Sequence, residues 1–200
     1  MRVTSSLITT LLASMLAITS CSTQAAYKVS SELTAPYYTD ADNQAKDDKD
    51  LQNKLKNLYK TQIPGNAIDI TAYSGEVLLV GQVPSSSDKA RAETIAKQIP
   101  YVKLVDNYLT VNANKPVLNS NSSLADKAMA RIKSQSDIDA QYVRVNAVDG
   151  VVYIMGSNLG NLTALDKAIK GIYAMDGVNQ VINLVKPGDK DYTESDVYVD

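Results

Sequence analysis

Two stretches of the chain carry the same succession of hydrophobic patterns. Each opens with an apolar stripe at helical spacing, formed by Leu51, Leu55, Leu58 and Tyr59 in the first stretch and by Leu124, Ala125, Ala128, Met129 and Ile132 in the second. An alternating segment follows, with Ile68, Ile70 and Ala72 on one face in the first stretch and Val143, Val145 and Ala147 in the second. These periods predict a helix and then a half-buried strand in each stretch.

The rest of each stretch predicts a hairpin, a second helix and a last strand. A turn containing Gly75 or Gly150 leads into segments 77–80 and 151–155, which are apolar on both faces, as in a central strand covered by helices. The dipeptide before the second of these strands, Asp149-Gly150, is typical of a type I′ turn. A run of Ser and Asp at 85–88 indicates a helix N-cap, and final strands are predicted over 102–111 and 178–185.

The two stretches match each other residue by residue. Residues 73–81 align with residues 148–156 at a spacing of 75, and residues 102–107 align with 178–183 at a spacing of 76. We therefore predict an α+β fold of two tandem αββαβ domains, each a three-stranded sheet covered by two helices. The expected boundaries are 47–113 for the first domain, 114–121 for a linker and 122–187 for the second domain. The polar linker is compatible both with packed and with independently moving domains.

The N-terminal segment is typical of a secretion signal. Leu7 to Ile18 is an apolar run of signal-peptide length, shorter than a membrane-spanning helix. It ends in Ile18-Thr19-Ser20-Cys21, which resembles the lipobox of bacterial lipoproteins, and Cys21 is the one cysteine of the chain. The resemblance implies removal of residues 1–20 and acylation of Cys21 with palmitate-type chains. The alternative is an ordinary signal peptide with an incidental cysteine.

Composition narrows the chemistry further. The chain has no His and a single Cys, which excludes Cys/His zinc sites and the usual catalytic triads. A net charge of −2 without an aromatic–basic cluster argues against nucleic acid. Ser86 and Lys89 form an S-x-x-K match, but its place at a predicted helix start favours capping. We therefore expect no catalysis, metal or cofactor. Outside the two domains we expect a flexible tether over 21–46 and an acidic tail over 188–200.

Residues 68–82, Ile-Asp-Ile-Thr-Ala-Tyr-Ser-Gly-Glu-Val-Leu-Leu-Val-Gly-Gln, resemble the BON domain. Together with the lipobox and the repeat, they are similar to the dual-BON outer-membrane lipoproteins. That resemblance implies a periplasm-facing, lipid-anchored protein that binds phospholipid, including anionic phospholipid, and supports envelope integrity. In enteric lipoproteins an Asp after the acylated Cys favours retention in the inner membrane. This chain has Ser22 there instead, and by that resemblance it favours the outer membrane.

In these relatives the first helix of the second BON domain meets the lipid. By that resemblance the candidate lipid-binding residues are Leu124, Lys127, Ala128, Arg131 and Lys133. The alternative interpretation is an ordinary helix whose apolar stripe packs on its own sheet while its charges face water. At the level of function, the alternative to a lipid-binding lipoprotein is a periplasmic adaptor that holds an envelope assembly or division protein.

Overall fold

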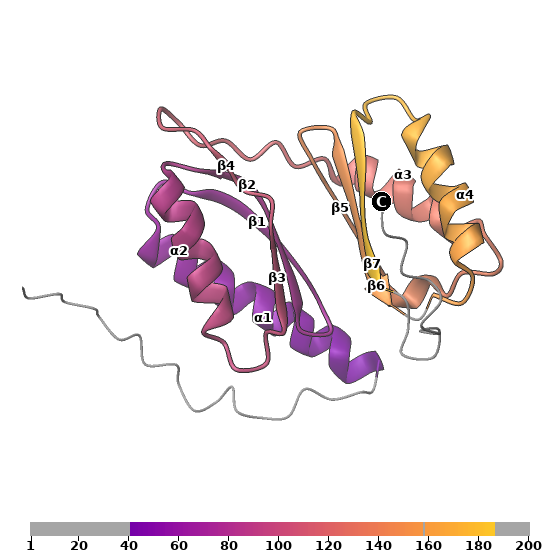
Figure 1. The fold of residues 1–200 in the computed structure, drawn as a ribbon, viewed down its shortest axis with the longest axis horizontal. Helices are drawn as coiled ribbons and strands as arrows, with labels where there is room; N and C mark the ends of the chain where they lie inside the picture. The colour runs from indigo at the N-terminus through magenta and orange to yellow at the C-terminus, as the bar shows by residue number, and fades with distance from the viewer. Residues whose placement is uncertain (1–40, 158, 187–200) are drawn as a thin grey trace, which may run out of the picture.

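The computed structural model describes residues 41–157 and 159–186, and side chains from residue 46 onward. Domain 1 contains α1 (Ala41–Gln62), β1 (Ala67–Tyr73), β2 (Glu76–Val83), α2 (Ser86–Lys97), β3 (Leu104–Asn107) and β4 (Thr110–Val111). Domain 2 contains α3 (Ser122–Lys133), the 3₁₀ helix η2 (Ala140–Tyr142), β5 (Val143–Val148), β6 (Val151–Ser157), α4 (Leu162–Tyr173) and β7 (Gln180–Lys186). This order confirms the predicted pair of αββαβ domains (Figure 1).

Each domain is built around a central strand with one antiparallel and one parallel neighbour. In domain 1, β2 pairs antiparallel with β1 and parallel with β3 and β4. In domain 2, β6 pairs antiparallel with β5 and parallel with β7. The hairpins turn at Ser74-Gly75 and Asp149-Gly150, where all four residues have positive φ, as a type I′ turn requires.

Two helices cover one face of each sheet and enclose its core. In domain 1 the stripe of α1 packs against α2 and the sheet, and the Tyr59 hydroxyl donates to the Ala92 carbonyl at 2.9 Å, which ties the helices together. Burial raises the pKa of Tyr59, so the phenol stays protonated and remains a donor. In domain 2 the buried residues of α3 and α4 form the equivalent cluster.

The structure differs from the predicted elements in two places. Helix α1 begins at Ala41, inside the range assigned to the tether, because residues 41–46 contain no Gly or Pro that would end a helix. The last strand of domain 1 is divided into β3 and β4, which keep one register with β2: Leu79 lies opposite Asn107, and Gln82 lies opposite Thr110. Residues 1–40, which include Cys21, and the acidic tail lie outside the described residues.

The two sheets pack face to face, so that the helices lie on the two outer sides of the molecule (Figure 1). The side chains between the sheets come from both domains: Tyr73, Leu78 and Val80 from domain 1 and Val148, Tyr153 and Met155 from domain 2. Leu78, Val80 and Met155 have no exposed surface at all. An apolar contact of this kind stabilises one relative position of the domains, which the sequence had left open.

Polar contacts surround this apolar interface. The Asn146 amide donates to the Asp69 carboxylate at 3.0 Å and to the Thr71 hydroxyl at 2.9 Å, which joins β5 to β1. Towards the opposite edges of the sheets, Lys186 of β7 forms a 2.6 Å ion pair with Glu76 of β2. Strand β1 therefore faces β5, and the β3 edge lies on the same side of the molecule as β7.

Candidate functional site

Helix α3, which carries the five candidate lipid-binding residues, is capped and oriented by its own sequence. The Asn121 side chain accepts from the Leu124 backbone N–H at 2.9 Å and so begins the helix. Arg131 and Lys133 lie in the last turn, where the partial negative charge of the helix C-terminus favours cations. The helix packs on β5 and α4.

The apolar members of the candidate set lie inside domain 2. Leu124 is 4% exposed and Ala128 is fully buried, and both belong to the core cluster that α3 shares with α4 and the sheet. The burial of these two side chains agrees with the alternative interpretation, in which α3 packs on its own sheet. The structure thus covers these two side chains, and the three basic residues of the candidate set are its exposed members.

Lys127, Arg131 and Lys133 are all exposed on the outer side of domain 2. Arg131 reaches across to α4, where Gly171 leaves room for it: a Cβ added at Gly171 would lie 2.3 Å from the Arg131 Nε. The absence of a side chain at Gly171 thus allows the guanidinium to lie over α4. The basic groups of the two helices thereby share one surface.

Helix α4 extends this surface with Lys167 and Lys170, which the sequence-based hypothesis did not include. Together α3 and α4 carry five cations against two acids, Asp126 and Asp166. None of the five cations forms an ion pair with another residue in the ranges 41–157 and 159–186. The helical period places Lys167 and Lys170 opposite the buried stripe, so this signal was present in the sequence.

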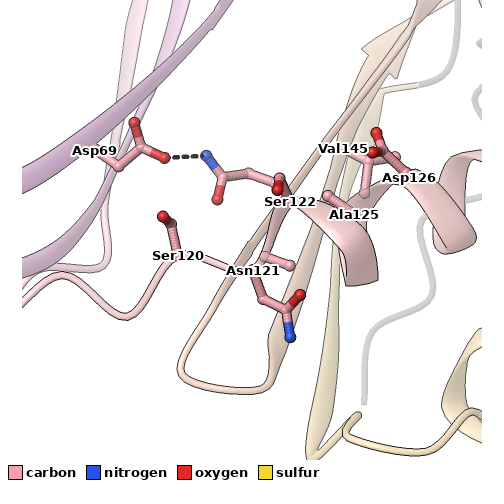
Figure 2. Close-up of a pocket in the computed structure, with 9 residues that line it drawn as sticks. Asp69, Ser120, Asn121, Ser122, Ala125, Asp126 and Val145 are labelled. Carbon is pink, nitrogen blue, oxygen red and sulfur yellow. Dashed lines mark hydrogen bonds between the residues drawn. The ribbon is translucent and has the colours of Figure 1, made fainter.

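A pocket of about 300 Å³ opens where the domains meet. Figure 2 shows Asp69 of domain 1 opposite Ser120 and the start of α3, with the hydrogen bond to Asn146 dashed. The pocket is lined by Asp69, Ser120, Asn121, Ser122, Ala125, Asp126, Val145, Asn146 and Ala147. Its two acids and no cation make it unsuited to a phosphate group.

A second polar cluster lies between β2, β3 and β7. Burial raises the pKa of the Asp106 carboxyl; Lys186 opposes this rise and Glu76 adds to it. The Glu76 Oε1 atom accepts from Lys186, while its Oε2 atom is buried and has no hydrogen-bond partner within the described ranges. Sequence reasoning could not find this cluster, since its members lie up to 110 residues apart.

The Ser and Asp run before α2 acts as a cap. The Ser85 hydroxyl oxygen accepts from the Asp88 backbone N–H at 3.1 Å, and Ser86 is the first residue of the helix. The capping residue is thus Ser85, one position before the S-x-x-K match. This local geometry agrees with the capping interpretation of the motif.

A family model named BON domain matches residues 47–113 and 120–187, which together cover most of the chain. The chain belongs to the BON-domain family. Its two BON domains correspond to the two packed units of the structure, and domain 2 carries the basic surface. No helix within 41–157 and 159–186 is long and apolar enough to cross a membrane.

Named relatives of this dual-BON chain come from several bacteria. The outer membrane lipoprotein DolP of Haemophilus influenzae is 31% identical over 70% of this chain and 74% of its own length. An uncharacterised protein from the gshII 5′ region of Anaplasma centrale is 30% identical over 60% of this chain and 82% of its own length. A 21 kDa hemolysin of Actinobacillus pleuropneumoniae is 28% identical over 70% and 73%.

Among solved structures, CdsD, a structural protein of the type III secretion system of Chlamydia trachomatis, aligns with 70% of this chain and 94% of its own. The TM-score is 0.29 and the sequence identity 13%. A likeness at this level has no bearing on function.

Proposed function

We propose that this protein is a non-catalytic lipoprotein of the outer membrane. In this proposal Cys21 carries the acyl chains, the BON domains face the periplasm, and domain 2 binds phospholipid and so helps to maintain the envelope. Membership of the BON-domain family and the likeness to DolP support the assignment. The lipobox at residues 18–21 supports the anchor.

One observation carries the lipid-binding part of the proposal. Five exposed cations, none with an ion-pair partner in the described ranges, lie on α3 and α4 of a chain whose net charge is −2. Each cation near an anionic membrane contributes about 1 kcal/mol at best. Since Leu124 and Ala128 are buried, binding depends on head-group charge, with Lys127, Arg131 and Lys133 as the central contacts.

Vesicle co-sedimentation tests this part of the proposal. The chain from Ser22 onward contains every described element and lacks the anchor, so any binding reports the folded domains. We expect it to sediment with vesicles containing phosphatidylglycerol at low salt, and binding to fall steeply as salt shortens the screening length to about 8 Å at physiological strength. No sedimentation with anionic vesicles at low salt would contradict the proposal.

A matched pair of charge reversals locates the contact. Replacing Lys127, Arg131 and Lys133 together by Glu should abolish vesicle binding, because the α3 surface becomes acidic. The control reverses Lys49, Lys56 and Lys60, three exposed lysines of α1 in domain 1, and should retain most of the binding. Equal losses in both variants would show net charge to be decisive and the α3 assignment to be wrong.

The adaptor alternative predicts a different result. Crosslinking in intact cells would then recover one stoichiometric envelope protein, and the α3 charge reversal would leave that complex in place.

A further inference from the structure

The two BON domains differ on one flank of their second helix. Alignment at the spacing of 76 places Leu162, Ile169 and Tyr173 of α4 where α2 has Ser86, Glu93 and Lys97. In domain 1 this flank is polar and closed: Lys97 pairs with Glu93, and the Asn107 amide donates to Glu93 at 3.2 Å and to the Lys89 carbonyl at 3.0 Å. In domain 2, Leu162 is 45% and Tyr173 is 57% exposed. The BON fold therefore does not require apolar residues at these positions.

The exposed flank of α4 faces the free edge of the sheet. At 100° per residue, Leu162, Ile169 and Tyr173 share one stripe, roughly opposite Gly171 on the helix. Gly171 faces Arg131 of α3, so the stripe faces away from α3. Helix α3 packs on β5 and α4 packs on β7, so the stripe borders the outer edge of β7.

The adjoining edge strands also differ between the domains. In domain 1 the edge is divided into two short strands, β3 and β4, and short edge strands limit pairing with another chain. In domain 2, β7 is continuous over seven residues, pairs with β6 along its whole length and has no strand on its other side in the described part of the chain. On this edge the Asn183 side chain accepts from the Val185 backbone N–H at 3.1 Å, so it must turn aside when another strand pairs there. A continuous edge of this length is otherwise suited to accept another strand.

Most of the exposed large hydrophobic residues lie on this side of the molecule. The seven large hydrophobic residues that are exposed in the described ranges are Leu104, Tyr108, Val111, Val117, Leu118, Leu162 and Tyr173. Three of them lie along the β3–β4 edge and two on α4 beside β7, while the other two lie in the linker. Lys186 of β7 pairs with Glu76 of β2, which lies opposite Leu104 of β3, so the β3 and β7 edges lie on the same side of the molecule.

The sequence of β7 shows what fits this edge. Gln180-Val181-Ile182-Asn183-Leu184-Val185-Lys186 has the same polar and apolar pattern in both directions, with Asn183 at its centre. Paired antiparallel with an identical strand, it places Val181 opposite Val185, Ile182 opposite Leu184 and Gln180 opposite Lys186. Apolar residues meet apolar residues and no like charges oppose each other. Such self-complementarity is what a two-fold interface between identical chains requires.

We infer that the occupant of this edge is a second copy of the chain. Two β7 strands pair antiparallel about Asn183 and join the domain 2 sheets into one six-stranded sheet. The two α4 helices then lie next to each other on one face, about 8–10 Å apart, and their Leu162, Ile169 and Tyr173 stripes meet. The dimer leaves the basic surface of α3 on the outside, so it stands independently of the lipid-binding proposal.

Disulfide trapping tests the register directly. In the chain from Ser22, which has no native cysteine, Asn183→Cys places two thiols directly opposite each other, with Cα atoms about 4.5–5.5 Å apart, a distance a disulfide spans. Gln180→Cys on the same edge places the thiols about 20 Å apart. Under mild oxidation at micromolar concentration we expect a covalent dimer from Asn183→Cys and almost none from Gln180→Cys. Equal yields would overturn the proposed pairing.

A second variant tests the α4 stripe without crosslinks. The triple change L162S, I169E and Y173K gives α4 the residues that α2 already carries. The I169E change places a carboxylate near Asn183, as Glu93 accepts from the Asn107 amide in domain 1. Sedimentation equilibrium should show a concentration-dependent dimer for the unchanged chain and a monomer for this variant, with circular dichroism confirming its fold. A parent chain that stays monomeric up to about 100 µM, or a folded variant that dimerises as the parent does, would overturn the inference.

Discussion

The carboxyl group of Asp106 lies where the domain 1 sheet meets β7. Its neighbours there are Glu76, which shares its charge sign, and Lys186, which is already paired with Glu76 at 2.6 Å. Burial raises the pKa of Asp106, which means that its ionised form is less favourable in the folded protein than in the unfolded chain. Lys186 thus interacts favourably with two carboxyl groups, those of Glu76 and Asp106.

This arrangement gives a pH-dependent stability. A carboxyl whose pKa is raised by folding binds its proton more readily in the folded state, so stability falls as pH rises through the interval between the unfolded and folded pKa values. We expect Asp106→Asn to raise the Tm at pH 7, with the gain disappearing below about pH 4. A pH series of thermal melts checks this, with the exposed Asp137→Asn as control. A Tm at pH 7 unchanged or lowered in Asp106→Asn would contradict it.

At the same scale, sequence patterns were sufficient for local features and insufficient for contacts across the interface. Asp149-Gly150 forms its turn through its own backbone preferences, and Asn121 caps α3 three residues away. The bonds of Asn146 to Asp69 and Thr71 join residues 77 and 75 positions apart. Nothing in the neighbourhood of Asn146 in the sequence distinguishes it from an ordinary surface amide.

Among the elements, each central strand closely approaches a residue at the start of, or just before, its antiparallel neighbour. A Cβ added at Gly81 of β2 would lie 2.2 Å from the Ala67 carbonyl oxygen, and one at Gly156 of β6 would lie 2.3 Å from that of Tyr142. Gly81 also has a φ of +102°, which disfavours any side chain. The repeat in the sequence therefore preserves a backbone contact as well as a hydrophobic pattern.

We expect Gly81→Ala to lower the free energy of unfolding by about 3 kcal/mol or more, since it adds a clash to an unfavourable backbone conformation. The control is Gly177→Ala, which has a φ of +85° but no atom within 4 Å of the added Cβ. That change should cost about 1–2 kcal/mol. Urea denaturation measures both, and equal losses would show the close approach to be unimportant.

Helical periodicity located α3 and its apolar stripe but could not decide what the stripe covers. Leu124 and Ala128 fit a membrane-facing helix and a core-facing helix equally well, because both need the same spacing. In the structure, β5 and α4 lie over the stripe.

At the scale of the whole molecule, the two BON domains share one continuous apolar interface between their sheets. Met155 is fully buried there together with Leu78 and Val80. Because each domain covers the inner face of the other, the pair should unfold as one cooperative unit rather than as two independent domains.

Placing a charge in this interface should separate the two unfolding events. We expect the unchanged chain to show a single calorimetric transition, and Met155→Glu to show two, because an unpaired buried carboxylate is strongly unfavourable. Leu78→Glu provides the reciprocal change from domain 1, and Ser123→Glu, at an exposed position, the control. A single unshifted transition in both interface variants would contradict cooperative unfolding.

The inward-facing sheets have a consequence for biogenesis. Ribosomes complete domain 1 before β5 and β6 exist, and at about 5–20 residues per second domain 2 follows several seconds later. During that interval the side chains of Tyr73, Leu78 and Val80 form an uncovered apolar surface on the folded domain 1. A chain at this stage of synthesis is therefore most prone to aggregation, and a chaperone that binds exposed apolar surface would protect it.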